Sequence, residues 1–453
     1  MTPDLAACYG QERLPRYTSY PTAPHFSSAI GAASYGEWLA AIPAQAIASL
    51  YLHIPFCRAM CWYCGCNTMV SKSDKHDGPI ADYTAALRRE VEMVTGWIGR
   101  RLAIAHIHFG GGTPTILAPE AFVDLVRLLR SSFFVQPDAE IAVEIDPRTL
   151  TAAMIEALGL CGVNRASLGV QSFDPVVQQA INRVQSFSQT AAATAGLRQA
   201  GIGGINFDLI YGLPHQSVAS CLDTVQRCVA LGPDRLSVFG YAHVPEFKMH
   251  QRMIPEASLP TTAARYDQAC AIANALQGEG YVQIGLDHFA LPDDAMAIAF
   301  CEGRLRRNFQ GYTTDGHEVL IGFGASAIGQ LPQGYVQNEP QVRAYSEAIS
   351  SGRLASVKGY QLTNDDRLRA DIIERIMCDH QVDLDAVCAR HGVVPDDVLE
   401  SAPRLQALLS DGVVELNGTS LAVPRNARTL LRSVAAAFDA HLDSSKQLHS
   451  HAV

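Results

Sequence analysis

The sequence lacks any run of about 18 apolar residues, so it predicts no membrane-spanning helix. Its first residues lack a basic segment followed by an apolar one, so we expect no secretory signal peptide. Positive charge is also in deficit: the formal net charge is −10, which argues against a general binder of nucleic acids or acidic membranes. An anionic ligand would therefore need a local basic pocket. Together these absences favour a cytoplasmic protein.

Cysteine is not scarce, with twelve residues, but it is unevenly placed. Four cysteines lie in CRAMCWYCGC, residues 57–66. In a cytoplasmic protein, clustered thiols more often bind metal than form disulfides. The other eight stand singly, mostly in apolar or helical patterns, and we interpret them as small buried hydrophobes. They are Cys8, Cys161, Cys221, Cys228, Cys270, Cys301, Cys378 and Cys388.

Short apolar segments alternate with helical patterns along most of the chain. Near-continuous apolar strands between amphipathic helices indicate a parallel sheet that helices cover. Six or seven such units in series predict an α/β fold built on a full or partial (β/α) barrel. The predicted strands are 49–56, 104–112, 140–146, 165–173, 204–212, 235–243 and 281–289, and the clearest helices are 82–98, 188–201 and 218–232.

The pattern changes after about residue 350. Residues 363–378 predict a helix with Thr363 as its cap and acidic residues in its first turn. More helix is expected over 383–410, and 412–423 predicts a hairpin with Asn417-Gly418 as its turn. Helices followed by a hairpin resemble a small winged-helix domain. We therefore divide the chain into an N-terminal arm (1–48), a barrel with an extension (49–350) and a mostly helical C-terminal domain (351–453).

Polar residues follow the predicted strands at the points where the strands end. In parallel barrels, catalytic and binding residues collect at the carboxyl ends of the strands. A regular series of polar residues at these ends therefore predicts one shared site. The series consists of Cys57, the run Gly110-Gly111-Gly112-Thr113, Glu144 to Asp146, Gln171, Asp208 to Tyr211, and Tyr241 to His243.

Cys57, Cys61 and Cys64 form a C-x3-C-x2-C loop after the first predicted strand. Such a loop can wrap three thiolates around one face of a [4Fe–4S] cluster, although clusters normally take four cysteines. Three ligands leave one iron open for a chelating small molecule. Cys66 becomes a fourth ligand only if the loop folds back within two residues. A structural zinc site usually draws on two separated pairs, and no second pair of this spacing is present. Zinc and redox-active thiols stay as minor alternatives.

This loop after a first barrel strand resembles that of the radical S-adenosylmethionine superfamily. The resemblance implies that the open iron binds S-adenosylmethionine, which one electron cleaves to a 5′-deoxyadenosyl radical. Other segments resemble the oxygen-independent coproporphyrinogen III oxidase family over nearly the whole chain. They are Cys66 itself, RYTSYPTA (16–23), FDLIYGLPHQ (207–216), LSVFGYAH (236–243), GLDHFALPDD (285–294) and RNFQGYTT (307–314).

The resemblance places two molecules of S-adenosylmethionine at the strand ends. The family usually has Phe at the position of Tyr63, so a backbone contact to adenine is implied and the side-chain packing stays open. Without the resemblance, each residue has another interpretation. The glycine run could form a tight turn, Glu144 could form a salt bridge within the barrel, and Gln171 could be a solvated polar residue. The residues assigned by resemblance are Tyr51, Tyr63, Gly111, Gly112, Thr113, Glu144, Gln171, Arg183, Asp208, Ala242 and Ile328.

Arginines are the expected partners of the substrate's carboxylates, because guanidinium groups bind carboxylates in pairs of hydrogen bonds. Our candidates are Arg16, Arg306 and Arg307, with plain surface charges as the alternative. The Pro- and Tyr-rich segment 16–23 suits an extended arm, and in the family this arm closes the substrate chamber. Three histidines are interpreted as hydrogen-bonded barrel residues rather than proton donors: His53, His243 and His288.

The resemblance implies anaerobic oxidative decarboxylation of two propionates, which converts coproporphyrinogen III to protoporphyrinogen IX in haem biosynthesis. It also implies a reductant of the flavodoxin or ferredoxin type, and nothing in the sequence demands a partner subunit, so we expect a monomer. The alternative is the family's haem chaperone branch, which usually carries HNxxYW and lacks the cysteine equivalent to Cys66. This sequence has RNFQGY instead. A plain electron carrier would have no use for a large barrel.

Overall fold

A twelve-stranded sheet is the largest element of the computed structural model, which describes residues 9–10, 12–72 and 78–442. Six neighbouring strands run parallel in chain order, and they confirm the first six predicted strands. Their near-continuous burial explains their apolar sequences. They are β1 (Ile47–Ile54), β4 (Ala103–Gly111), β5 (Phe134–Ile145), β6 (Arg165–Gln171), β7 (Gly204–Tyr211) and β8 (Arg235–Gly240).

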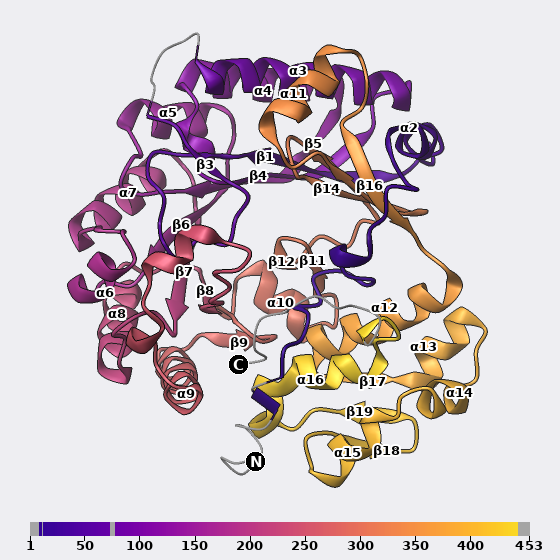
Figure 1. The fold of residues 1–453 in the computed structure, drawn as a ribbon. Helices are drawn as coiled ribbons and strands as arrows, with labels where there is room; N and C mark the ends of the chain where they lie inside the picture. The colour runs from indigo at the N-terminus through magenta and orange to yellow at the C-terminus, as the bar shows by residue number, and fades with distance from the viewer. Residues whose placement is uncertain (1–8, 11, 73–77, 443–453) are drawn as a thin grey trace.

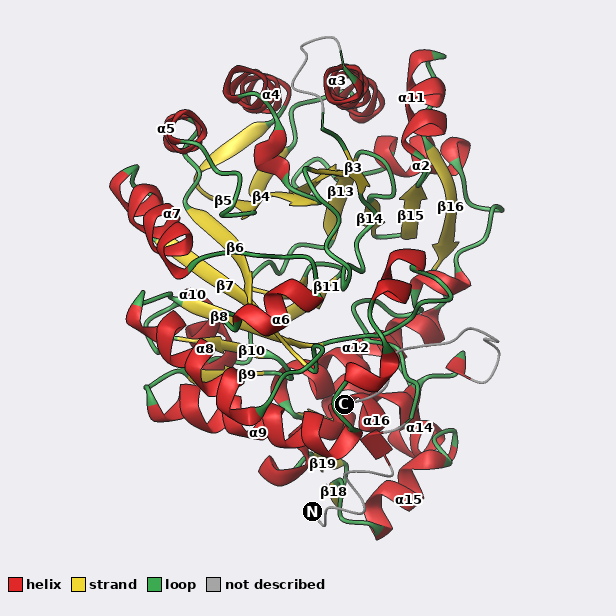
Figure 2. Cartoon of the chain, turned by 60° about the vertical axis from the view of Figure 1, so that its left-hand side comes forward, coloured by secondary structure: helices red, strands yellow, loops and turns green. Residues whose placement is uncertain are grey.

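Helices cover the outer face of these strands, as Figure 2 shows. The helix α4 illustrates why: its buried residues Phe122, Leu125, Val126 and Leu129 repeat at helical spacing and form one apolar stripe. Burying each such side chain contributes roughly 1.5–3 kcal/mol. The covering helices are α3 (Pro79–Ile98), α4 (Pro119–Ser132), α5 (Ala152–Leu160), α6 (Pro175–Ala180), α7 (Phe187–Gln199), α8 (Val218–Ala230) and α9 (Thr262–Gly278).

The two edges of the sheet differ from the sequence prediction. The short strand β13 (Val319–Phe323) was not predicted, yet it lies parallel to β1 on the side away from β4. The predicted strand 281–289 is a hairpin of β9 (Val282–Ile284) and β10 (His288–Ala290), because a turn at 285–287 interrupts it. The edge strands are β9 and β16, so the barrel is partial. Beyond β13, the sheet continues with the antiparallel strands β14 (Ile328–Leu331), β15 (Gly334–Asn338) and β16 (Ser356–Gln361). The helix α11 (Val342–Ser350) lies between β15 and β16 in the chain and packs against α3.

The last part of the chain is mostly helical, as predicted. Thr363 caps α12 (Asn364–Asp379) through its side chain, which accepts a hydrogen bond from the Asp366 backbone. The hairpin is present, but Asn417 pairs with Ser420, so its loop is Gly418-Thr419, one residue later than predicted. The remaining elements are β17 (Gln381–Asp383), α13 (Leu384–His391), α14 (Pro395–Glu400), α15 (Arg404–Ser410), β18 (Glu415–Asn417), β19 (Ser420–Ala422) and α16 (Leu431–Ala435).

The N-terminal arm runs from beside α16 to α2 (Ala32–Ala40), as the indigo trace in Figure 1 shows. Its residues Leu14, Tyr17 and Tyr20 are buried in the same hydrophobic cluster as α12 and α16. The Tyr17 hydroxyl also donates to Asp439 at 3.0 Å. The arm is thus fastened to the C-terminal part of the chain. Our division at residue 350 stays a prediction, but β16 pairs within the main sheet, so the C-terminal unit starts after it.

No helix in the described parts of the chain is long and apolar enough to cross a membrane. Eleven cysteines are described, and all are free thiols. Of the eight predicted buried cysteines, five are buried, Cys270 is half-buried, Cys301 is exposed, and Cys8 lies outside the described residues.

Candidate active site

A cavity of about 810 Å³ opens at the carboxyl ends of the parallel strands, where the sequence predicts a shared site. We call it the cluster cavity. It brings together most of the predicted residues from segments far apart in the chain. They are Cys57, Cys61, Tyr63, Cys64, Cys66, Gly111, Gly112, Thr113, Glu144, Gln171, Arg183, Asp208 and Ala242.

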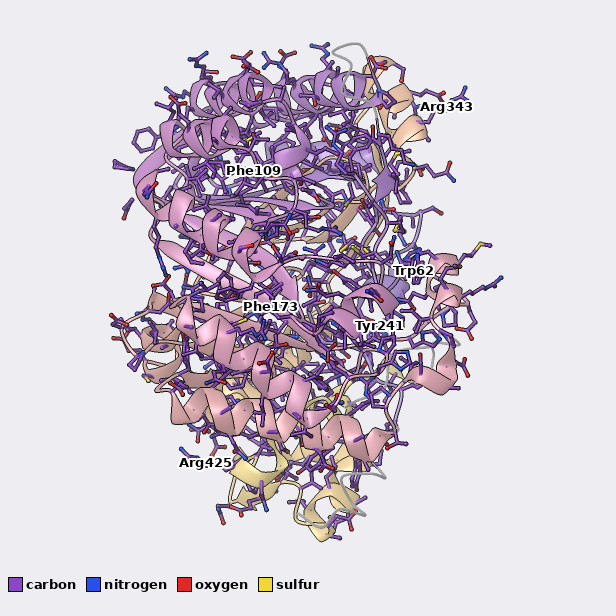
Figure 3. All side chains as sticks on the ribbon, turned by 90° about the vertical axis from the view of Figure 1, so that its left-hand side faces the viewer. Trp62, Phe109, Phe173, Tyr241, Arg343 and Arg425 are labelled. Atoms are coloured by element: carbon purple, nitrogen blue, oxygen red, sulfur yellow. The ribbon has the colours of Figure 1, made fainter. Side chains whose placement is uncertain are left out.

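The cysteine loop follows β1 and is held from two sides. Its first cysteine, Cys57, lies in the short strand β2 (Phe56–Cys57), which pairs with β3 (Met69–Val70). From the other side, the segment after β8 donates to three loop carbonyls: Lys248 Nζ to Cys66, His250 Nε2 to Cys64, and Gln251 Nε2 to Tyr63, at 2.7–3.1 Å. Trp62 and Tyr63 pack in one small cluster with Tyr241, which Figure 3 shows on the same side of the molecule as Trp62.

As placed, the thiols stand too far apart for three of them to bind one metal ion. No three of the four thiol sulfurs between Cys57 and Cys66 lie within 4.8 Å of one another. In a tetrahedral zinc site, the thiolate sulfurs lie about 3.8 Å apart, because each is about 2.3 Å from one ion. In an iron–sulfur cluster, each thiolate binds its own iron and the sulfurs stand further apart. The loop therefore fits a cluster.

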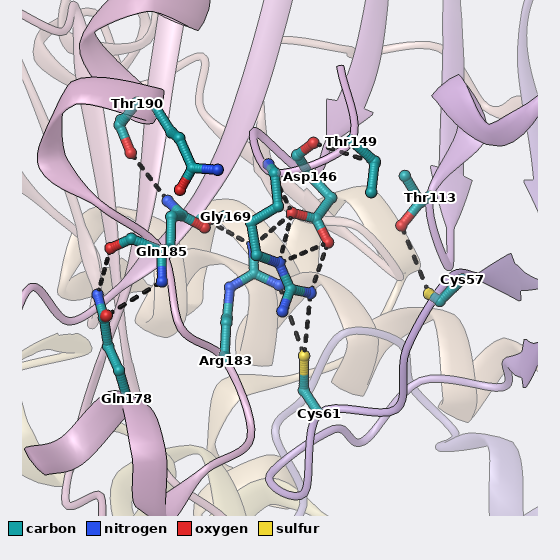
Figure 4. A network of polar contacts seen from close by, with 12 residues as sticks. Cys57, Cys61, Thr113, Asp146, Thr149, Gly169, Gln178, Arg183, Gln185 and Thr190 are labelled. Carbon is teal, nitrogen blue, oxygen red and sulfur yellow. Dashed lines mark hydrogen bonds and ion pairs between the residues drawn. The ribbon is translucent and has the colours of Figure 1, made fainter. Parts of the chain in front are cut away.

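Two of the thiols accept hydrogen bonds from the cavity wall, as Figure 4 shows. Thr113 Oγ1 lies 3.4 Å and Thr68 Oγ1 3.3 Å from Cys57 Sγ. Two guanidinium groups, those of Arg148 and Arg183, donate to Cys61 Sγ at 3.5 and 3.6 Å. Hydrogen bonds to cysteine sulfurs tune the reduction potential of a cluster. These residues are placed to do so.

Cys64 and Cys66 share a thiol hydrogen bond. This contact is the main reason why the pKa of Cys64 falls to about 6 and that of Cys66 rises well above its ordinary value. The side chain of Cys66 is exposed. In this pair Cys64 therefore accepts the hydrogen bond and Cys66 donates it.

The glycine run after β4 forms a floor beside the thiols. A Cβ atom on Gly112 would stand 2.6 Å from both the Phe56 carbonyl oxygen and Thr68 Oγ1, and one on Gly110 would stand 2.6 Å from Glu144 Oε1. Gly111 has φ of 113°, which L side chains rarely adopt. Only glycine therefore fits at these positions, because neighbouring residues pack directly against the backbone of the run.

Two carboxylates line the cavity, and their pKa values shift in opposite directions. Glu144, at the end of β5, accepts from the Gly111 backbone at 3.0 Å and lies 3.1 Å from His108 Nε2. Burial opposes its charge, but these contacts outweigh burial and lower the pKa of Glu144. Burial raises the pKa of Asp208, although Ser167 donates to it at 2.7 Å, and the Glu144 charge adds to the rise. Such a pair suits hydroxyl or ammonium groups of a ligand.

Gln171 ends β6 and Arg183 lies in the loop after α6, and both are constrained. Gln171 is nine-tenths buried with φ of 66°, a left-handed conformation that is strained for a side chain and typical of functional sites. Arg183 donates to the Gly169 carbonyl at 2.6 Å and lies 3.5 Å from Asp146. Arg148 also binds Asp146, at 2.6 Å. Sequence reasoning missed Arg148, although it follows a strand end only four residues after Glu144.

Two predicted residues lie outside the cluster cavity. The Tyr51 ring lies behind Gly110, and its hydroxyl is 3.0 Å from His53 Nδ1. Ile328 lies in β14, which neighbours β13 rather than the strands that end at the cavity. The three histidines have polar partners, as interpreted: His53 with Asn67, His243 with Tyr241 and His288 with Asp287.

A second cavity, of about 790 Å³, lies beside the first, and we call it the arginine cavity. Four residues line both cavities: Arg16, Gly240, Tyr241 and Ala242. Of the three predicted arginines, Arg16 and Arg307 line the arginine cavity. The third, Arg306, lies in β11 (Arg306–Asn308) and lines neither of these two cavities; its side chain lies 2.9 Å from Glu374.

Comparison with known proteins agrees with this geometry. Residues 51–228 match the Radical SAM superfamily and residues 362–430 match the HemN C-terminal domain. The chain is 68% identical to an oxygen-independent coproporphyrinogen III oxidase of Bradyrhizobium diazoefficiens, over 100% of both chains. It is 43% identical to one of Cereibacter sphaeroides, over 96% of both.

A solved structure shows the same fold. The coproporphyrinogen III oxidase HemN from Escherichia coli, described as a radical SAM enzyme, matches with a TM-score of 0.90 and 36% identity over 95% of this chain and 100% of that one. The match includes the C-terminal segment as well as the barrel. The chain therefore belongs to the oxygen-independent coproporphyrinogen III oxidase family of the radical S-adenosylmethionine superfamily.

Proposed function

We propose that this chain converts coproporphyrinogen III to protoporphyrinogen IX by anaerobic oxidative decarboxylation. The observation that carries the proposal is the cysteine loop: three thiols spaced for a cluster, beside a glycine floor and Glu144, in a chain 68% identical over its full length to a relative named for this activity. No feature of the described residues favours the haem chaperone alternative.

Cys57, Cys61 and Cys64 are the proposed ligands of the [4Fe–4S] cluster. When bound, the cluster and S-adenosylmethionine supply the electron and the carbon radical that removes a hydrogen atom from a propionate side chain. The chain itself holds these groups and the substrate in fixed positions and excludes water. Residues 14–16 of the arm line the cluster cavity opposite the thiols and are the proposed cover of the site.

Two groups of residues are proposed to bind two molecules of S-adenosylmethionine. Next to the open iron, the backbone of Gly111, Gly112 and Thr113 faces the amino acid part, and Glu144 stays charged to accept from it or from the ribose. The aromatic side chain of Tyr63 lines the same wall. The second molecule would contact residues on the neighbouring strands: Gln171, Arg183, Asp208 and Ala242. Tyr51 and Ile328 could act only from behind this wall.

The substrate is proposed to occupy both cavities. Its carboxylates cannot enter a dry site unpaired, because each buried ion costs several kcal/mol. Arg16 and Arg307 are the proposed partners, since both line the arginine cavity and Arg16 also reaches the cluster cavity. We leave Arg306 out of this site.

We further propose an electron donor of the flavodoxin or ferredoxin type, because the chain's own residues cannot supply the electron that the cluster needs. Both cavities are built from one chain, which supports action as a monomer. The free thiols of the described cysteines support a reducing, cytoplasmic location.

An anaerobic assay tests the proposed activity. Protein with a reconstituted cluster, coproporphyrinogen III, S-adenosylmethionine and a low-potential reductant should yield vinyl porphyrin and 5′-deoxyadenosine. Cluster-loaded protein that gives neither product rejects the proposal. Stoichiometric haem binding without turnover would instead favour the chaperone.

A further inference from the structure

The arginine cavity is far richer in positive charge than a chain with net charge −10 leads one to expect. Among the described residues that line it, Asp287 is the one carboxylate. The arm supplies one arginine, α9 and β11 supply one each, and the segment just before and within α16 supplies three. They are Arg16, Arg265, Arg307, Arg425, Arg428 and Arg432.

Backbone carbonyls and aromatic rings hold several of these guanidinium groups in place. Arg307 donates to the carbonyls of Tyr17 and Arg16, both at 3.2 Å, and its guanidinium carbon lies 4.3 Å from the centre of the Tyr312 ring. Arg265 donates to the Tyr241 carbonyl at 2.8 Å. Such contacts orient an arginine without neutralising its charge. The charges thus remain available to a ligand.

The clustering of these charges is unfavourable without an anion. Burial, and after it the charge of Arg16, lower the pKa of Arg432 to about 9. Burial and the charge of Arg425 likewise lower the pKa of Arg428. Within the described residues, Arg307 Nη1 and Arg428 Nε are buried without a hydrogen-bond partner. A ligand with more than one carboxylate would satisfy these groups, because planar guanidinium matches carboxylate in paired hydrogen bonds.

The two cavities differ in what they can do to such a ligand. The cluster cavity holds the thiols, and its own arginines Arg148 and Arg183 are engaged with Asp146. The arginine cavity holds no thiol of the cysteine loop. Arg16 and the end of β8 line both, so one macrocycle can lie across the boundary.

We propose that the arginine cavity anchors the propionates that do not react, while the cluster cavity receives the propionate that is decarboxylated. The inference rests on the proposed function, in which two of the substrate's four propionates are lost and two survive. The two surviving propionates are present during both decarboxylations, so a site that binds them can hold the substrate throughout. Residues 425–432 thereby become part of the substrate site, although they lie far from the radical SAM segment of the chain.

Binding measurements without turnover test this division. The cluster-loaded protein is titrated anaerobically with coproporphyrin III, which has four propionates, and with deuteroporphyrin IX, which has only the two that survive. Arg428→Gln and Arg307→Gln should each weaken both ligands by about 10- to 100-fold, the effect of losing a hydrogen bond to a charged group. Arg304→Gln is the control, because Arg304 is exposed and bound to Glu302. If a variant does not fold, Arg425→Gln replaces it.

The outcomes distinguish binding of the surviving propionates by the arginine cavity from the proposed decarboxylase activity. Equal losses for the two porphyrins, with unchanged iron content and S-adenosylmethionine binding, support the anchor. A loss for the four-propionate ligand alone would assign the arginines to the reacting side chains and overturn the proposal. Unchanged affinity in both variants would overturn it as well. The protein could bind porphyrin through these arginines and yet form no vinyl product. That result would reject the proposed activity but not the role of the arginines in binding propionates.

Discussion

The cluster cavity and the arginine cavity have almost the same volume but differ in their balance of charge. In the cluster cavity, Glu144 lies beside His108, and Asp146 binds two arginines. The arginine cavity sets six arginines against Asp287. Balanced charge suits a cofactor that carries both positive and negative groups, whereas an excess of guanidinium suits a ligand with several carboxylates. This difference is the basis of our proposal that the cluster cavity holds the reacting groups and the arginine cavity binds the other propionates.

The two cavities also differ in how the chain builds them. The cluster cavity comes mainly from strand ends and one loop, which a rigid sheet fixes in space. The arginine cavity comes from the arm, a helix, a short strand and the C-terminal segment. Changes in one cavity should therefore leave the other intact, and three predictions follow from this independence.

The largest effect is expected from Cys57→Ser. Loss of one of only three thiolates should remove the bound iron and abolish formation of vinyl porphyrin. Affinity for deuteroporphyrin IX, which has only the two surviving propionates, should change by less than about twofold, since Cys57 does not line the arginine cavity. Iron analysis, the anaerobic assay and a porphyrin titration measure the three quantities.

Cys301→Ser is the matched control, because Cys301 is exposed at the end of α10 (Ala295–Cys301) and should keep both iron and activity. A Cys57→Ser protein that keeps its full iron content would contradict the assignment of three ligands.

A smaller effect is expected from Glu144→Gln. The amide replaces a charged acceptor of the Gly111 N–H, so affinity for S-adenosylmethionine should fall about 10- to 100-fold, as for other hydrogen bonds to charged groups. Calorimetric titration of the cluster-loaded protein measures this affinity, and porphyrin affinity should not change. Asp138→Asn is the control, an exposed position on the same strand. Equal affinity in Glu144→Gln and the control would remove Glu144 from the cofactor site.

The third prediction concerns the free energy of unfolding rather than activity or ligand affinity. Burial raises the pKa of Glu90 on α3 to about 7. Hydrogen bonds from Gly324, Tyr345 and Asn338 lower the pKa, but burial outweighs them. Between the unfolded and folded pKa values, the folded state binds the extra proton, so the free energy of unfolding falls as pH rises from about 5 to about 8. A shift of this size corresponds to at most about 3 kcal/mol.

Urea titrations across this range should show the fall in wild type and a flatter profile in Glu90→Gln. Glu92→Gln, on the exposed side of the same helix, should keep the wild-type slope. The same slope in all three proteins would show that Glu90 does not titrate in this window. Porphyrin affinity should be unaffected, because Glu90 lines neither cavity.

The sequence predicts the cluster cavity far better than the arginine cavity, for a physical reason. Strand ends in a parallel barrel meet at one edge, so Cys57, Glu144 and Gln171 can be brought together by period and spacing alone. Arg265, Arg428 and Arg432 follow no shared period, and only tertiary packing of the arm and the C-terminal segment joins them. Arg306 and Arg307 could not be told apart for the same reason, since alternation along a three-residue strand cannot be assigned before the strand is known. The strand β13 was missed because five residues carry too little pattern.

The fastening of the arm to the C-terminal segment has a consequence for synthesis of the protein. The arginine cavity needs Arg16 and Arg432, which are 416 residues apart in the chain. A nascent chain still on the ribosome can assemble the strands that carry the cysteines long before it can assemble the porphyrin chamber. The substrate chamber can therefore form only after residue 432 has been synthesised.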